Sequence, residues 1–131
     1  MTRVFLVEDD PTTQLILSTQ LQLGGYEVSA FDRTDSAIDA LPVEKPRGLV
    51  LDYQLPDGTA EDVIRALGAE IREVPVIVVT GYDNPRLRDR LFELGIRAFL
   101  HKDPELAFIE KLCPEVDRML AAVSPDRGVP G

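Results

Sequence analysis

The stretch "GLVLDYQLPDG", residues 48–58, decides the fold class of this 131-residue chain. Its aliphatic run, residues 49–51, stops abruptly at Asp52, and a turn-like segment with Pro56 and Gly58 follows. A continuous aliphatic run is typical of a parallel strand that is covered on both faces. The sequence therefore predicts a central strand that ends on a carboxylate. Taken alone, that carboxylate could be a helix cap, a metal ligand or a nucleophile.

Short apolar runs alternate with segments of helical length along the rest of the chain. The other runs are residues 3–7, 26–31, 74–79 and 97–100, and the helical segments are 11–23, 34–41, 59–71, 84–95 and 103–112. This alternation predicts an α/β domain with a doubly wound parallel sheet. We expect the domain to span residues 1–122, with residues 123–131 as a disordered tail or a linker stub.

The first helical segment has recognisable ends. Asp10 is the expected N-cap, Pro11 follows it, and Gly24 stops the helix. The apolar spacing that predicts this helix is that of Leu15, Ile16, Thr19 and Leu23.

Later helices are also marked by caps and prolines. Thr59 and Asp62 form a capping-box-like pair, and Asn84 caps the fourth helix. Because proline lacks an amide donor, we expect Pro42 to end the second helix and Pro114 to kink or break the last one.

Composition excludes several classes of function. The formal net charge is −9, with 23 acidic and 14 basic residues, which argues against direct binding of nucleic acid. The single cysteine, Cys113, cannot form an internal disulfide and indicates a reducing compartment. Neither a signal peptide nor an apolar segment of about 20 residues is evident. The sequence therefore predicts a soluble cytoplasmic protein that does not enter a membrane.

Four of the five predicted strands end on chemically useful residues, namely Glu8 with Asp9, Asp52, Thr80 and Lys102. In open α/β sheets, ligands bind outside the carboxyl ends of the strands. With a sheet order of 2-1-3-4-5, the three acids would crowd one pocket. Each residue alone has an ordinary structural explanation; together, in this order, they indicate a site.

Crowded carboxylates need a compensating charge. Two of them about 4 Å apart repel by roughly 4 kcal/mol at an effective dielectric constant near 20. Mg²⁺ would relieve this repulsion, because it prefers oxygen ligands and often also holds a phosphate oxygen. Lys102 and Thr80 could bind a phosphoryl group, which leaves Asp52 as a nucleophile able to form an acyl phosphate.

The motifs resemble those of the receiver domain of two-component response regulators over residues 2–121. "VFLVEDDP" resembles the first strand and acidic pair of that family, and "LVLDYQLPDG" its phosphoacceptor motif, although Gly58 comes one place early. "VIVVTG" and "AFLHK" resemble its fourth and fifth strands. The resemblance implies a flavodoxin-like (CheY-like) fold with five parallel strands in the order 2-1-3-4-5.

The resemblance also implies roles for site residues. Asp52 would accept phosphate from a histidine kinase or a histidine phosphotransfer protein. Asp9 and Asp52 would bind Mg²⁺ directly, Glu8 mostly through water, and Gln54 through its backbone carbonyl. Lys102 would contact the phosphoryl group. Such a domain catalyses only its own phosphorylation and dephosphorylation.

A switch and an output face are implied as well. Thr80 and Phe99 would reorient on phosphorylation and remodel the face made by the fourth helix, fifth strand and fifth helix, through which a downstream protein or a second copy would bind. Gln54 and Tyr82 occupy positions that tune the rate of dephosphorylation in this family. The family usually has proline directly after the lysine, whereas here Asp103 intervenes, which puts the conformation of that loop in question.

Two alternatives remain open at this point. A degenerate receiver would bind partners without being phosphorylated. A haloacid dehalogenase-like phosphohydrolase would share the aspartate nucleophile, but Gln54 stands where its second aspartate is needed and the chain lacks length for a cap domain. The arginines at 86, 88 and 90 indicate a solvated helix face or a partner contact.

Overall fold

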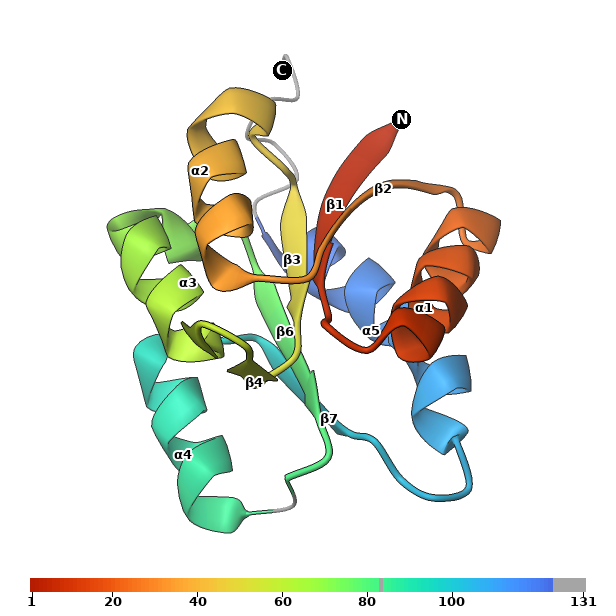
Figure 1. Ribbon diagram of the computed structural model, residues 1–131. Helices are drawn as coiled ribbons and strands as arrows, with labels where there is room; N and C mark the ends of the chain where they lie inside the picture. Colours follow the sequence, from red (N-terminus) through yellow and green to blue (C-terminus); the bar gives the residue numbers. More distant parts are fainter. Residues whose placement is uncertain (83, 124–131) are drawn as a thin grey trace.

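The computed structural model describes residues 1–82 and 84–123, so most of the predicted tail lies outside the described residues. Within this part of the chain, one parallel sheet of five strands has the order β2-β1-β3-β6-β7 (Figure 1). These strands are β1 (Thr2–Val7), β2 (Tyr26–Phe31), β3 (Gly48–Leu51), β6 (Val76–Thr80) and β7 (Ala98–His101). In chain order of the sheet strands this is 2-1-3-4-5, so the predicted topology is confirmed.

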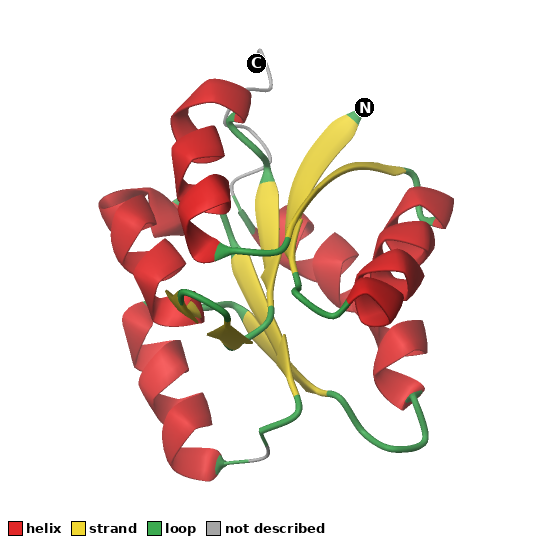
Figure 2. Cartoon of the chain, in the orientation of Figure 1, coloured by secondary structure: helices red, strands yellow, loops and turns green. Residues whose placement is uncertain are grey.

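Helices cover both faces of the sheet (Figure 2). One face carries α1 (Pro11–Leu23) and α5 (Ala107–Ala122), and the other carries α2 (Thr34–Glu44), α3 (Ala60–Leu67) and α4 (Pro85–Leu94). The central strand serves both layers, because Leu49 and Leu51 pack in the core on the α2–α4 side while Val50 packs in the core on the α1–α5 side. The aliphatic run of β3 is thus buried on both faces, as its composition predicts.

The side chains that α1 buries are not the apolar residues from whose spacing the helix was predicted. Asp10 caps it as expected, its carboxylate accepting a hydrogen bond from the Thr13 backbone N–H at 2.8 Å. However, the buried residues are Leu17 and Leu21, whereas Leu15 and Leu23 are 67% and 78% exposed. The expected spacing was wrong because apolar residues occur around this helix, so that periodicity alone does not select its inner face.

A short antiparallel hairpin follows the central strand and was not predicted. It pairs β4 (Gln54–Leu55) with β5 (Gly58–Thr59). Asp57, at its turn, caps α2 from a distance: its carboxylate oxygens accept hydrogen bonds from the backbone N–H groups of Thr34 at 2.8 Å and Asp35 at 3.0 Å. Since the local N-cap residue, Arg33, makes no side-chain cap, the hairpin after Asp52 itself supplies the start of α2.

Two prolines lie inside helices that they were expected to end or interrupt. Pro42 lies in the last turn of α2, which continues to Glu44. Pro114 lies inside α5, which is one helix from Ala107 to Ala122, so the expected break is wrong. Pro114 is exposed, and so is Glu110, whose carbonyl loses its intrahelical partner and can bond to water instead. Burial of other α5 side chains then holds the helix together, namely Phe108, Leu112, Val116 and Met119.

Helix α3 is shorter than the predicted segment 59–71. The predicted capping box is present: Thr59 Oγ1 accepts from the Glu61 backbone N–H at 3.2 Å, and the Asp62 carboxylate accepts from the Thr59 backbone N–H at 2.9 Å. The α-helix ends at Leu67 and a 3₁₀ helix, η1 (Gly68–Arg72), takes over. Gly68 has φ 57°, a left-handed value that glycine adopts readily and that ends the α-helix there.

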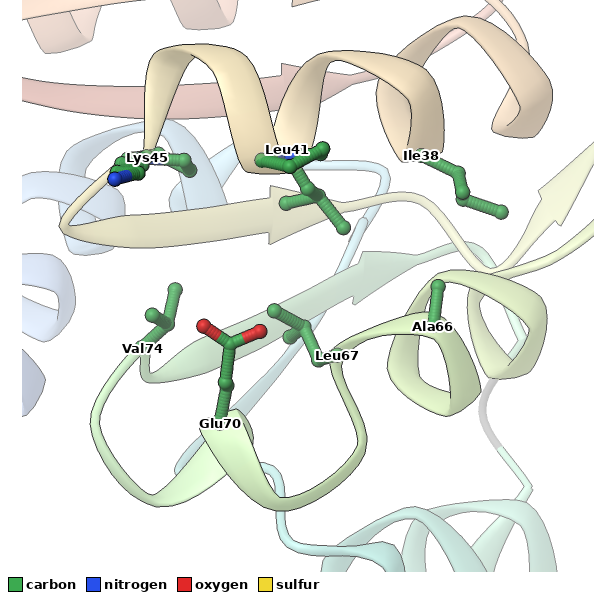
Figure 3. Close-up of a pocket in the computed structure, with 9 residues that line it drawn as sticks. Ile38, Leu41, Lys45, Ala66, Leu67, Glu70 and Val74 are labelled. Atoms are coloured by element: carbon green, nitrogen blue, oxygen red, sulfur yellow. The ribbon is translucent and has the colours of Figure 1, made fainter.

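An apolar groove of about 410 Å³ lies between α2 and the α3–η1 segment. In Figure 3, Ile38 and Leu41 point into it from α2, and Leu67 and Val74 point in from the opposite wall. Its residues precede β3 and β6, so the groove lies at the amino-terminal edge of the sheet, away from Asp52.

In the described part of the chain, no helix is both long and apolar enough to span a membrane.

Replacing Pro114 with alanine is expected to stabilise the protein. The change restores an amide donor at an exposed position of the continuous helix α5, and proline costs about 3 kcal/mol relative to alanine inside a helix. Allowing for the greater freedom of the unfolded chain, we expect Pro114→Ala to raise the free energy of unfolding by about 1–2 kcal/mol in urea titrations. Pro104→Ala, in the loop before α5, is the control and should bring no gain. An unchanged or lower stability of Pro114→Ala would contradict this account.

Candidate functional site

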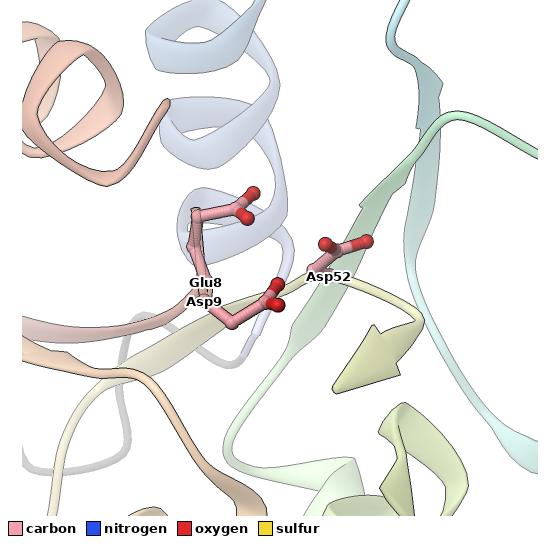
Figure 4. Close-up of side chains that lie close together, drawn as sticks. All are labelled: Glu8, Asp9 and Asp52. Atoms are coloured by element: carbon pink, nitrogen blue, oxygen red, sulfur yellow. The ribbon is translucent and has the colours of Figure 1, made fainter. Parts of the chain in front are cut away.

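Three carboxylates meet where β1 and β3 end (Figure 4). The two strands are neighbours, and the Asp52 backbone N–H donates to the Val7 carbonyl at 2.9 Å, which aligns their ends. As a result, one carboxylate oxygen from each of Glu8, Asp9 and Asp52 lies within 4.8 Å of the others. Glu8 is buried, Asp52 is half-buried and Asp9 is exposed, so the cluster runs from the protein interior to solvent.

A single lysine bridges two of these acids. Lys102 Nζ lies 2.6 Å from Glu8 Oε1 and 3.2 Å from Asp52 Oδ2. Its backbone N–H donates to the Thr80 carbonyl at 2.8 Å, which fixes the end of β7 against the end of β6. The structure thus brings together Glu8, Asp9, Asp52 and Lys102 from three strands, as the strand-end pattern predicts.

Burial controls the electrostatics of the cluster. Desolvation raises the pKa of Glu8 and of Asp52, although Lys102 acts in the opposite direction on both. Burial by itself would lower the pKa of Lys102, but its bonds to Glu8 and Asp52 outweigh this and raise it. Lys102 therefore stays charged, whereas burial disfavours the simultaneous ionisation of Glu8 and Asp52.

Thr80, Gln54 and Tyr82 lie around this cluster rather than in it. Thr80 is buried, and its Oγ1 accepts a hydrogen bond from the Tyr82 backbone N–H at 3.3 Å. The Tyr82 hydroxyl donates to the Gln54 side-chain oxygen. The two segments that follow Asp52 and Thr80 are therefore joined by the two residues at the expected rate-tuning positions.

Phe99 lies apart from the acids, on the α4 side of β7. It is half-buried and packs against the core cluster on that face. Its ring lines a cavity of about 230 Å³ together with residues of α4 and His101. An aromatic side chain with free volume beside it, next to an exposed helix, is suited to a change of rotamer.

Asp103 has a structural role that the sequence did not reveal. Its Oδ2 and Oδ1 accept hydrogen bonds from the backbone N–H groups of Ala107 and Phe108, both at 2.9 Å. These bonds, the one from Ala107 foremost, lower the pKa of Asp103. Helix α5 consequently begins at Ala107 rather than at the expected residue 103, and the carboxylate beside Lys102 is committed to this helix start. All peptide bonds in the described residues are trans.

Sequence reasoning missed further residues around the site. Asp57 was interpreted only as part of a turn, and nothing in the sequence indicated that Glu61 would bond to both Tyr53 and Arg90. The one available signal was a tyrosine directly after Asp52. Its partner Glu61 lies 8 residues further on, in α3, and Glu61 in turn bonds to Arg90 of α4 at a separation of 29 residues, which no local pattern encodes.

The acidic cluster fits a hard divalent cation. Its donors are carboxylate oxygens on adjacent strand ends, one of them exposed, which suits Mg²⁺ because this ion keeps several of its waters. A soft or borderline metal would favour thiolate or imidazole ligands, and none belongs to this cluster.

Residues 4–112 match the family model of the response regulator receiver domain. The chain belongs to the response regulator receiver domain family. Such domains act in two-component signalling, where they interact with kinases and downstream effectors, and they are signalling domains rather than ordinary enzymes. The family binds Mg²⁺ at an acidic pocket, which corresponds here to the cluster of Glu8, Asp9 and Asp52.

Similar proteins come from plants and bacteria. The chain is 26% identical over 116 residues to the two-component response regulator ORR3 of Oryza sativa subsp. indica, covering 86% of this chain and 88% of that protein. It is 27% identical over 126 residues to the response regulator MprA of Mycobacterium sp. (strain KMS), covering 96% of this chain but 54% of MprA. A signal receiver domain from Vibrio parahaemolyticus superposes with a TM-score of 0.87 at 25% identity, covering 99% of this chain and 98% of that one.

Neutralising Asp52 is expected to stabilise this receiver domain. Because burial raises the pKa of Asp52 in the folded state, its charge destabilises the fold at neutral pH, and this cost disappears as the pH falls through the raised value towards 3.8. In the presence of a chelator, Asp52→Asn should raise the free energy of unfolding by on the order of 1 kcal/mol at pH 7, a gain typical of functional positions. The gain should shrink on acidification.

Asp57→Asn provides a control of opposite sign. Backbone hydrogen bonds, the one from Thr34 foremost, lower the pKa of Asp57 to about 2, so its charged form stabilises the fold above pH 3.8. Asp57→Asn should therefore be less stable than the parent at pH 7, and this deficit should vanish as the pH falls towards 2. Urea titrations between pH 2 and pH 8 would measure both series. If both variants shifted stability in the same direction, the electrostatic account of the site would be wrong.

Proposed function

We propose that Asp52 is the phosphoacceptor of this receiver domain and that phosphorylation there depends on Mg²⁺ held by the acidic cluster. One observation carries the proposal: Lys102 Nζ lies 3.2 Å from Asp52 Oδ2 and 2.6 Å from Glu8 Oε1, within a cluster that includes Asp9. A nucleophilic oxygen, a fixed cation and additional carboxylates thus occupy one edge of the sheet, where open α/β sheets bind ligands.

The chain's own residues can carry out the transfer. An Asp52 carboxylate oxygen attacks the phosphorus of a phosphohistidine; the new O–P bond forms as the N–P bond breaks, and the imidazole leaves with the bonding electron pair and takes up a proton. Lys102 offsets the negative charge of the phosphoryl oxygens, because it is already held beside the nucleophile. The Thr80 hydroxyl would supply a hydrogen bond to one of those oxygens.

The metal would be held by Asp9 and Asp52 directly, by Glu8 largely through water, and by the Gln54 backbone carbonyl. When bound, Mg²⁺ supplies positive charge that offsets both the carboxylate repulsion and the charge on the transferred group. Glu8 has a second role, since its buried carboxylate orients the Lys102 amine. Because the Glu8 carboxylate already accepts hydrogen bonds from Lys102 and from the Asp10 backbone N–H, an indirect contact with the ion is favoured.

We further propose that Thr80 and Phe99 transmit the change at Asp52, and that Gln54 and Tyr82 set how long the acyl phosphate survives. The two latter side chains are joined by a hydrogen bond beside the site, where they can obstruct an attacking water molecule. The partners would be a histidine kinase or histidine phosphotransfer protein in the cytoplasm and a downstream protein that binds the α4–β7–α5 face, with a homodimer through that face as an alternative.

Phosphorylation by a small phosphodonor tests the proposal. On incubation with acetyl phosphate and Mg²⁺, the protein should gain a single phosphoryl group by intact-mass analysis, and Asp52→Asn should gain none. Lys102→Met should slow the gain by about 100-fold, because loss of one preorganised charge at a reacting group costs about 3 kcal/mol. Lack of labelling in the parent, together with no binding of beryllofluoride, would favour a degenerate receiver. Turnover of free phosphomonoesters would favour the phosphohydrolase.

Metal binding has a separate test in thermal unfolding. Mg²⁺ at ten times its dissociation constant should stabilise the parent by about 1.4 kcal/mol, because it binds the folded state only. Asp9→Asn should abolish this gain, and Glu105→Gln, which removes an exposed acid outside the cluster, should preserve it. Equal Mg²⁺ responses of the two variants would show that the ion acts by general screening rather than at this site.

A further inference from the structure

A buried carboxylate next to the site joins three elements of the fold. Glu61, in the first turn of α3, is 7% exposed. Its Oε2 accepts a hydrogen bond from the Tyr53 hydroxyl at 3.1 Å, and its Oε1 forms an ion pair with Arg90 Nη2 of α4 at 2.8 Å. We refer to Tyr53, Glu61 and Arg90 as the Glu61 network. Because the two oxygens of one carboxylate bind different partners, a movement of Tyr53 or of Arg90 shifts Glu61 and thereby the other partner.

Tyr53 connects this network to both segments that surround the phosphoacceptor. It directly follows Asp52, and its carbonyl accepts the Ala60 backbone N–H at 2.7 Å. Its ring meets that of Tyr82 edge to face, with centroids 6.2 Å apart. Through Tyr82 it contacts the segment after Thr80, whose hydroxyl is bonded to the Tyr82 backbone N–H.

Helix α4 depends on the network because it is weakly packed. Over its ten residues it buries only Leu91, whereas the eight residues of α3 include five that are buried. Arg90 is 66% exposed, but the carboxylate that it meets is 9% exposed, and a charge-assisted hydrogen bond to a buried acid is among the stronger polar contacts. Arg90, which the sequence assigned to a solvated helix face or a partner contact, therefore attaches α4 to the rest of the domain.

We propose that Glu61 is a positioning residue for the phosphorylation site, which ties α4 to the loop after Asp52 and favours the arrangement seen without phosphate. This inference rests on the proposed function of Asp52. Thr80 Oγ1 accepts from the Tyr82 backbone N–H, so a turn of this hydroxyl towards a phosphoryl oxygen would shift the Tyr82 segment and the contact between the Tyr82 and Tyr53 rings. The Glu61 network resists that shift and transmits it to α4.

The network can be tested first without any phosphate. In hydrogen exchange of the unliganded protein, Glu61→Gln and Arg90→Met should each speed exchange of α4 amides by about three- to tenfold, because α4 then opens more easily. The double variant should exchange no faster than either single variant, since both remove one interaction. Arg86→Met, which removes another exposed arginine of α4, is the matched control and should have no effect, and Arg90→Lys should restore most of the protection.

The second readout is the affinity for beryllofluoride with Mg²⁺. Weakening an attachment that favours the unliganded arrangement should tighten binding by about three- to tenfold in Glu61→Gln and in Arg90→Met. Tyr53→Phe should tighten binding similarly while leaving α4 exchange near that of the parent, because it cuts the network on the loop side only. A purely structural role for Glu61 would weaken binding or leave it unchanged.

The outcomes separate this inference from the proposed function. Additive effects of the two single variants on exchange, or an equal effect of Arg86→Met, would overturn the network. If the two single variants speed exchange without adding up but leave the beryllofluoride affinity unchanged, in a parent that binds it, the role of Glu61 at the site would be overturned. A parent that binds no beryllofluoride at all would count against Asp52 as phosphoacceptor, and exchange would still decide whether the Glu61–Arg90 ion pair attaches α4 to the domain.

Discussion

The repulsion among carboxylates at the ends of two neighbouring parallel strands is the constraint on which the rest of this structure depends. Strands β1 and β3 are aligned by backbone hydrogen bonds, so Glu8, Asp9 and Asp52 cannot separate without breaking the centre of the sheet. Burial raises the pKa of Glu8 and Asp52 and so adds to the cost. Lys102, delivered from β7, offsets part of that cost by contacting both. The fold holds the acids together and leaves their charge only partly balanced.

The surrounding loops are built to keep this arrangement in place. Asp57 starts α2, Thr59 starts α3 and Asp103 starts α5, so the segments that leave the site are each fixed by a polar side chain at the beginning of a helix. Each cap satisfies backbone donors that would otherwise lack partners, which stabilises the start of the helix that leaves the site. Helix α4 is the exception: Asn84 caps it, but it shares little buried surface with the sheet.

The sequence was most informative where one local signal had one structural meaning. Apolar runs predicted all five sheet strands, the resemblance to receiver domains implied their order, and the residues that end the strands predicted that Glu8, Asp9, Asp52 and Lys102 would meet. It failed where tertiary contacts decide. Pro114 does not break α5, because the helix is held by buried side chains on its other faces. The prediction of the inner face of α1 was wrong because apolar residues surround that helix. The start of α5 was missed because it depends on a hydrogen bond that the Asp103 carboxylate accepts from a backbone N–H four residues further on.

Residues that couple elements are the hardest to recognise from sequence, because their meaning lies in pairs far apart along the chain. Arg90 belongs to a run of arginines that looks solvated, and only its position opposite the buried Glu61 distinguishes it from Arg86 and Arg88. This asymmetry bears on how a signal could leave the site. A helix anchored by many buried residues would not respond to a small change at Asp52, and one without anchors would respond to nothing. A helix with one buried leucine and one ion pair, the latter bonded through Glu61 to the residue after Asp52, has the intermediate attachment that a switch requires.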